Sequence, residues 1–397
     1  MVKEPHSSTS KQVPFSGSFE WTSARFGAKE SHAETASINL KQQIHGIVNS
    51  TGSINSRVRR LSRFYNQYSG QFARRHIVTM LWGLGQLADS SMTRGQLLNA
   101  RKIVEPLTAR LLKQLPEFAD QYKPETVAAV FQSVSNLRRW GMRNIRASNE
   151  ETLEGLAEYA REHLDNFSVR QLARILRSAA DLRVGGTGLN NKAIDVLLKR
   201  SRQFSRYPNS CVICFEALAS QSSRAFRRVW LNYAGKLDLE KLTEQNLMRL
   251  YHALLAAKRP VPDLLSQRVD GIIKKKQENM PRPNSFERDV ERHVHKLAPK
   301  DLIVVAQALV EGYRVDLLLM REKQPGIVIE CDGDRFHYMV NSAGRVMRNG
   351  RSRLKDKVLR ATGHDILRVK YSSWKRMSDS KRREFLRKEL KKLGVEF

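Results

Sequence analysis

The sequence has few cysteines and no long apolar run. Three cysteines in 397 residues exclude a secreted scaffold held by disulfides and are typical of a reducing compartment. Because no run of about 18 apolar residues occurs, no transmembrane helix is expected. Cys211 and Cys214 form a CxxC pair, but no second pair follows nearby, and both fall on the apolar face of a predicted helix. The sequence therefore predicts no zinc or other metal site.

Acidic residues are scarce relative to basic ones. The chain has 70 Lys and Arg against 40 Asp and Glu, a formal net charge of +30. Such an excess attracts phosphate polymers, which release counterions on binding. A nucleic acid is therefore the favoured partner, with an anionic membrane surface and a basic surface without a partner as alternatives. A hydrophobic content of 41% is enough for a buried core, so the chain is not predicted to be disordered throughout.

The N-terminal segment, residues 1–56, is polar and interrupted by Gly and Ser. It predicts an extended, partly disordered tail with one helix near Ile38–Val48. Residues 1–18 contain neither the apolar core of a secretory signal nor a clear Arg-rich amphipathic transit peptide. This segment therefore gives no targeting assignment of its own.

The central region, residues 57–280, repeats one apolar pattern at i, i+3, i+4, i+7 and i+10, which places a single stripe on one helix face. The five stripes are Ile77–Leu87, Val127–Leu137, Leu172–Leu182, Cys211–Gln221 and Leu247–Ala257. A second helix fits after each, at Leu97–Leu112, Thr152–His163, Leu189–Lys199, Arg224–Asn232 and Leu264–Lys274. Helix pairs recurring at about 35–50 residues predict an α-helical repeat region of the α-solenoid type. Five unrelated helices in one bundle are the alternative.

A break at Pro281–Asn284 begins a region of different character, residues 281–397. The expected elements are a helix at Ser285–Leu297, strands at Tyr313–Met320 and Gly326–Cys331, a basic helix at Ser352–Ala361, a strand at His364–Val369 and a helix at Asp379–Leu393. This order predicts a small α/β layer fold.

Three segments of this region resemble the RAP domain family. Val328–Tyr338 joins a strand to an Asp-Gly…His element, Leu354–Leu367 contains the basic helix and the next strand, and Val369–Trp374 ends in the Tyr/Trp element. Members of the family pair such a domain with helical repeats and act on mitochondrial or plastid RNA. The resemblance implies a small α/β domain with a restriction-endonuclease-like fold.

That implied fold raises the question of a metal-dependent RNA nuclease. Such enzymes hold Mg²⁺ with carboxylates and polarise the attacking water with a Lys. Asp316 and Glu330 are the candidate ligands, and Glu287, Asp332 and His337 complete a set of candidate relic residues. Asp332 occupies the position of the Lys two residues after Glu330. We therefore expect a binding domain without catalytic residues or cofactor, and Mg²⁺ only if the nuclease alternative holds.

The residues expected to contact RNA are basic or aromatic. Arg345–Arg353 is predicted to be a flexible basic loop, because Gly344, Asn349 and Gly350 interrupt it. Rings beside cations suit single-stranded or looped RNA, although Trp374 is equally compatible with a core position. The expected set is Arg335, Arg345, Arg348, Arg351, Arg353, Lys355, Lys357, Arg360, Lys370, Tyr371, Trp374, Lys375 and Arg376.

These features together predict an organellar RNA-binding protein. The resemblance places it in the mitochondrion, with the plastid as the alternative. The favoured role is binding of ribosomal RNA as a structural component or assembly factor of the mitochondrial ribosome, with other ribosomal subunits as partners and no membrane. Alternatives are a transcript processing or stability factor, the metal-dependent nuclease, and a protein-interaction scaffold.

Overall fold

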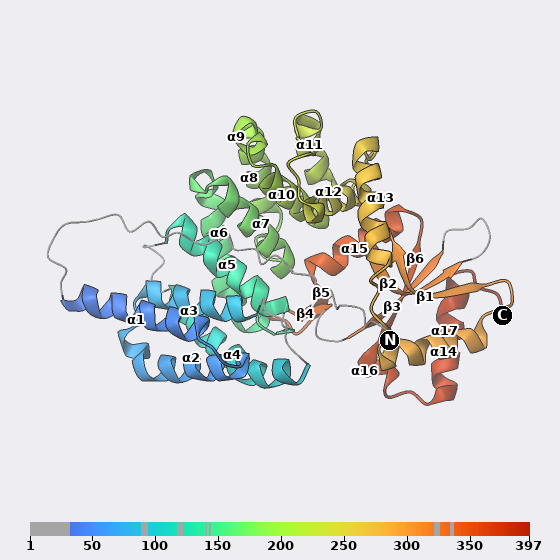
Figure 1. The fold of residues 1–397 in the computed structure, drawn as a ribbon, viewed down its shortest axis with the longest axis horizontal. Helices are drawn as coiled ribbons and strands as arrows, with labels where there is room; N and C mark the ends of the chain where they lie inside the picture. The colour runs from blue at the N-terminus through green and yellow to red at the C-terminus, as the bar shows by residue number, and fades with distance from the viewer. Residues whose placement is uncertain are drawn as a thin grey trace, which may run out of the picture.

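The chain folds into a helical region followed by a small C-terminal domain built on a sheet (Figure 1). The computed structural model describes residues 32–88, 94–116, 122–139, 141–142, 144–320, 326–333 and 337–397. Within these ranges no helix has the length and apolar character needed to cross a membrane.

Six helices form an inner row in which each helix packs on the next. They are α1 (His32–Asn49), α3 (Arg74–Leu87), α5 (Pro124–Arg139), α7 (Val169–Leu182), α10 (Pro208–Gln221) and α12 (Glu244–Ala256). The five predicted apolar stripes lie in α3, α5, α7, α10 and α12, with Ala257 as the C-cap of α12. At positions i, i+3, i+4, i+7 and i+10 of each stripe, every residue except Gln221 is buried. The periodicity therefore predicted these helices correctly.

A second, outer row of helices packs behind the first. It consists of α2 (Ile54–Tyr68), α4 (Arg94–Gln114), α6 (Glu150–Glu162), α8 (Gly186–Lys199), α11 (Ser223–Tyr233) and α13 (Asp263–Gln277). The last five contain the predicted second helices. Short turns η1 (Ser69–Gln71), η3 (Ala147–Asn149), η4 (Leu164–Asn166) and α9 (Ser201–Ser205) connect the rows. Capping hydrogen bonds fix where helices begin. At the start of α7, Ser168 and Gln171 form a capping box, in which the side chain of each accepts the backbone N–H of the other.

The helix predicted near Ile38–Val48 lies within α1, but the extended tail predicted around it is not found over residues 32–56. Leu40, Ile44 and Val48 of α1 are buried, and α1 packs on α3. Their helical spacing gives α1 an apolar face that joins the core. The predicted boundary at residue 56 falls inside α2. Residues 1–31 lie outside the described residues.

The C-terminal domain has a four-stranded sheet with the order β1-β2-β3-β6, in which β3 and β6 are parallel and the other pairs antiparallel. The strands are β1 (Ile303–Val310), β2 (Tyr313–Met320), β3 (Ile327–Asp332) and β6 (Asp365–Lys370). A separate ribbon joins β4 (Tyr338–Val340) to β5 (Val346–Arg348). The sequence prediction missed β1, β4 and β5.

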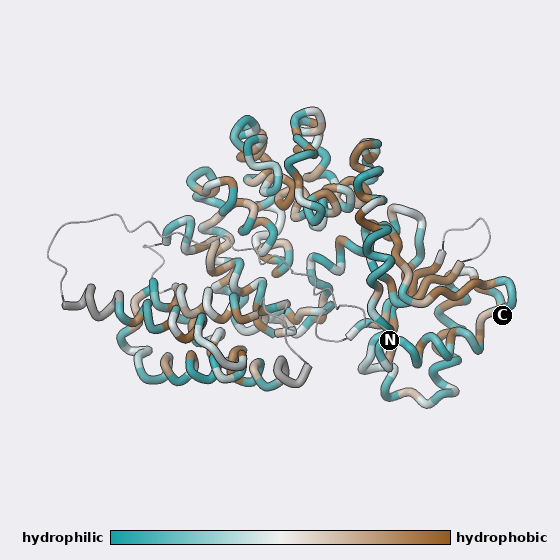
Figure 2. The backbone as a smooth tube through the Cα atoms, viewed as in Figure 1, coloured by the Kyte–Doolittle hydropathy of each residue, from teal (hydrophilic) through white to brown (hydrophobic). Residues whose placement is uncertain are grey.

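Helices cover both faces of this sheet. α14 (Ser285–Leu297) and α17 (Asp379–Lys392) pack on one face, and α15 (Gly350–Ala361) on the other. Figure 2 shows the strands as the most continuously hydrophobic segments of the domain. A single turn, α16 (Tyr371–Trp374), follows β6.

The C-terminal domain packs on the inner row of the helical region. Leu354 and Val358 of α15 are buried in the core of the helical region, against α7, α10 and α12. Gly350 permits this approach, because a Cβ atom there would lie 2.5 Å from the carbonyl oxygen of Ala180. Figure 1 shows α15 and the β4–β5 ribbon between the helical rows and the sheet. This helix therefore belongs to two cores at once.

Candidate nucleic-acid interface

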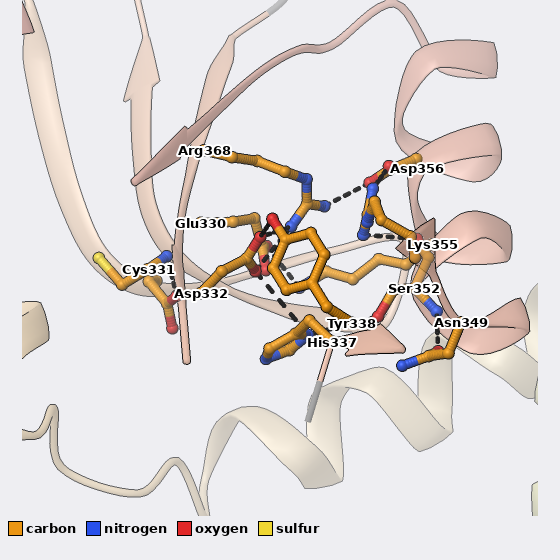
Figure 3. A network of polar contacts seen from close by, with 12 residues as sticks. Glu330, Cys331, Asp332, His337, Tyr338, Asn349, Ser352, Lys355, Asp356 and Arg368 are labelled. Atoms are coloured by element: carbon orange, nitrogen blue, oxygen red, sulfur yellow. Dashed lines mark hydrogen bonds and ion pairs between the residues drawn. The ribbon is translucent and has the colours of Figure 1, made fainter. Parts of the chain in front are cut away.

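Two carboxylates of β3 point into the layer between the sheet and α15 (Figure 3). The carboxylate of Asp332 accepts two hydrogen bonds from Nη1 of Arg368, at 2.8 and 2.9 Å, and one from the Tyr338 hydroxyl at 2.6 Å. Burial alone would raise the pKa of Asp332, but Arg368 and Tyr338 outweigh it and hold that pKa below its usual value. Asp332 is thus an ionised, fully engaged acceptor.

The second carboxylate, Glu330, pairs with Lys355 of α15. The Lys355 ammonium also donates to the carbonyl oxygen of Arg314 at 2.6 Å. Asp356, the next residue of α15, pairs with both Arg348 and Arg368. These ion pairs fasten α15 and the β4–β5 ribbon to the sheet.

The remaining relic candidates, Asp316, Glu287 and His337, lie near Glu330 and Asp332 but make different contacts. Asp316 accepts a hydrogen bond from the backbone N–H of Cys331 at 2.7 Å, and burial followed by the Glu330 charge raises its pKa to about 6. Glu287 accepts the backbone N–H of Asn284 at 3.0 Å and thereby caps α14. His337 lies 3.8 Å from Asp332, and burial lowers its pKa.

This arrangement does not fit a Mg²⁺ ion. Glu330 and Asp332 each hold a cation of the chain itself, Lys355 and Arg368. In the ranges that the structure describes, no three His, Cys, Asp or Glu side chains are grouped so that they could hold a metal. In this structure the carboxylates of Glu330 and Asp332 form ion pairs within the domain.

Several predicted RNA contacts turn inward. Lys357 donates to the carbonyl oxygen of Ala219 at 2.8 Å, and burial followed by Arg353 lowers its pKa to about 8. Arg348 and Lys355 belong to the ion pairs with the sheet. Arg353 is half-buried. Arg351 is an exception, because its side chain is 52% exposed although its Nε lies 3.8 Å from Asp181 of α7.

The predicted flexible loop over Arg345–Arg353 is therefore wrong. β5 occupies Val346–Arg348, and the buried Asn349 caps α15 by accepting the N–H of Ser352 at 2.9 Å. The glycine at 350 serves close packing rather than mobility.

Trp374 occupies the core, which corrects its expected role in stacking on a base. Its side chain is only 2% exposed, and its indole N–H donates to Asp289 at 2.8 Å. The ring meets the His293 ring edge-on, with centroids 5.3 Å apart. The buried indole closes the core between the sheet, α14 and α17.

Four of the predicted residues form an exposed group, which we call the Tyr371 patch: Lys370, Tyr371, Lys375 and Arg376. Tyr371 is 37% exposed and packs edge-on against Phe286 at 5.2 Å between centroids. Lys370 lies 5.2 Å from the Tyr338 ring. Arg345, Arg351 and Arg360 are also exposed, and Arg335 lies outside the described residues.

Sequence analysis missed a charged crevice between α7, α10 and α15. Arg177, Asp181, Glu216 and Arg351 line it. Burial followed by the nearby Arg249 lowers the pKa of Arg177 to about 10. No local pattern links the members of this cluster, because α15 lies far from the others in sequence.

These observations define a class of protein: a two-row helical region joined to a basic α/β domain in which the exposed Tyr371 ring lies among cations. The family of that domain follows from comparison, since residues 329–389 match the RAP domain. The chain therefore contains a RAP domain, as the motifs predicted, and the match runs from β3 into α17. A search of curated proteins found no match.

Proposed function

We propose that this protein binds RNA, and that it does so in mitochondria as an rRNA-binding component or assembly factor of the mitochondrial ribosome. The observation that carries the proposal is the Tyr371 patch on a RAP domain. An exposed ring stacks on an unpaired base, and cations beside it reach the phosphates on either side. The net charge of +30 adds long-range attraction to any RNA.

Two finer features of the fold belong to the same proposal. The inner and outer rows, with one apolar pattern repeated in five inner helices, support an α-solenoid. Helices on both faces of a mixed sheet support a restriction-endonuclease-like fold for the RAP domain. In this interpretation the domain retains the nuclease-like fold, while the carboxylates of Glu330 and Asp332 form ion pairs with Lys355 and Arg368.

RNA binding is tested with the full-length protein and a fluorescent single-stranded RNA of mixed sequence. We expect binding whose logarithmic affinity falls steeply and linearly with the logarithm of salt concentration, because phosphate contacts release counterions. Absence of binding at low salt would overturn the proposed function.

The cellular role is tested by fractionation and crosslinking. We expect the protein in mitochondria, sedimenting with a ribosomal subunit, and its crosslinked RNA to be dominated by rRNA. Messenger or precursor transcripts as the dominant species would instead support a processing or stability factor. Sedimentation free of rRNA and of ribosomal proteins would exclude the ribosomal role.

The nuclease alternative has one observation in its favour, the closeness of Asp316, Glu330 and Lys355. A Mg²⁺-dependent cleavage assay decides it, with Asp316→Ala and Glu330→Ala as controls. We expect no cleavage by the parent protein. Cleavage that both variants abolish would restore the enzyme interpretation.

A further inference from the structure

The five repeated helices of the inner row place equivalent positions along one line. Relative to the first residue of each apolar stripe, the residue five places later is Trp82, Gln132, Arg177, Glu216 and His252 in α3, α5, α7, α10 and α12; it is half-buried in the first four helices and buried in α12. The residue two places earlier is Arg75, Glu125 and Arg170 in the first three of these helices. Because these two offsets lie seven residues apart, about two helical turns, they share one helix face.

The RAP domain covers the C-terminal part of this line. Arg177 and Glu216 line the crevice against α15. His252 contacts the carbonyl oxygen of Glu311, in the turn between β1 and β2, at 2.8 Å. The RAP domain therefore covers part of the inner face of the helical region in the same chain.

The N-terminal part of the line remains partly or fully exposed, from α1 to α7. We call it the open inner face and define it by His45, Arg75, Trp82, Gln132, Arg170 and Arg174. It combines cations with aromatic rings at both ends. At one end the His45 and Trp82 rings lie 5.0 Å apart, and at the other the Arg170 guanidinium lies 5.7 Å from the ring of Tyr207, which is 40% exposed.

Like charges crowd together on this face. Burial followed by the Arg75 charge lowers the pKa of Lys41, and burial followed by the Arg170 charge lowers the pKa of Arg174. Glu125 is the acid at the equivalent position of α5. A polyanion laid along the face would relieve this repulsion, and its unpaired bases would stack on the rings.

We infer that the open inner face binds single-stranded RNA, whose path ends where α15 docks on α7. This inference rests on the proposed RNA-binding function and assigns it a second surface, remote from the Tyr371 patch. The partner is RNA rather than an acidic protein segment, because aromatic rings lie beside cations at both ends of the face, and rings bind unpaired bases while cations bind phosphates.

Two matched double variants of the full-length protein test the inference. Arg170→Gln with Arg174→Gln removes two charges from the face, and Arg224→Gln with Arg227→Gln removes two from exposed positions of outer helix α11. With a mixed-sequence single-stranded RNA, the first pair should reduce the slope of log affinity against log salt by about 1.4, since each phosphate contact on a single strand contributes about 0.7. The second should leave that slope within error of the parent.

Crosslinking of the unaltered protein keeps the test independent of any folding defect. RNA containing 4-thiouridine should form adducts at Trp82 or His45, and Trp82→Leu should weaken binding about tenfold. Equal salt slopes for both double variants, with adducts confined to residues 370–397, would overturn the inference and leave RNA binding by the RAP domain intact. Failure of the parent protein to bind RNA would overturn the proposed function itself. Competition by poly-glutamate as effective as that by RNA would overturn the assigned partner.

Discussion

At the scale of single residues, two neighbouring rings of the RAP domain have opposite surroundings. Tyr371 is exposed among cations, whereas Trp374 is buried and hydrogen-bonded to Asp289. The sequence does not distinguish the surroundings of the two rings. Both lie within four positions after β6, and Tyr and Trp each occur both in cores and at base-stacking sites. Burial decides the question, and burial depends on α14 and α17, which lie before and after this turn in the chain.

The two rings should respond differently to substitution. Tyr371→Ala should weaken RNA binding about tenfold and leave the melting temperature nearly unchanged. Trp374→Phe should lower stability by about 1–3 kcal/mol, because it leaves a void in the core and removes one donor from the half-buried Asp289 carboxylate, and should leave RNA affinity unchanged. Anisotropy titration and thermal unfolding measure both effects. A loss of affinity confined to the Trp374 variant would restore its predicted stacking role.

Asp316 should make stability depend on pH. Its pKa is raised from 3.8 to about 6 in the folded state, so the folded protein binds more protons than the unfolded chain between these values. Stability from this group is therefore present below pH 4 and is lost as pH rises through 6. Asp316→Asn should be more stable than the parent above pH 6, by on the order of 1 kcal/mol after allowance for solvent screening, with no difference near pH 4.

Chemical denaturation at several pH values measures this difference. Asp365→Asn, a change at an exposed carboxylate of β6, is the control. If the difference in free energy of unfolding between Asp316→Asn and the parent does not change with pH, the predicted role of Asp316 ionisation is contradicted.

At the scale of elements, periodicity predicted the five stripe-bearing helices and the later helices well, because apolar spacing is a local property. It missed β1, whose residues are mostly half-buried and lack a clean alternation of apolar and polar side chains. It also interpreted the segment before α15 as a mobile loop. Glycine there permits contact with the backbone at Ala180 of α7, a partner 170 positions away that no local pattern indicates.

Gly350 should therefore tolerate no side chain. Gly350→Ala brings a Cβ atom to 2.5 Å from the Ala180 carbonyl oxygen, so either α15 or α7 must shift. We expect a loss of about 1–3 kcal/mol and faster amide exchange in α15 and in the last turn of α7. Gly333→Ala, where a Cβ atom would meet no atom within 4 Å, should change neither.

At the scale of the whole molecule, α15 unites the helical region with the RAP domain. Leu354 and Val358 face the helical core, while Leu359 packs against the sheet. The predicted boundary at residues 280 and 281 falls between α13 and α14, yet the two parts share a buried interface. A pattern read along the chain reveals where elements begin, but it does not reveal which distant surfaces they bury.

This shared helix predicts that the protein unfolds as one unit. Replacing Leu354 and Val358 with Ala removes buried contacts on the helical side only, at a cost of about 2–5 kcal/mol for the leucine alone. The parent should show a single urea transition followed equally by circular dichroism and tryptophan fluorescence, and the double variant should show two. Hydrogen exchange should rise on both sides of the interface, in α15 and in α10 and α12.

Leu386→Ala, at a buried position on the opposite face of the sheet, is the control. It should raise exchange in α14 and α17 while α10 and α12 keep their protection. Two transitions already present in the parent would show that the RAP domain folds independently, and α15 would then be a contact surface rather than part of a common core.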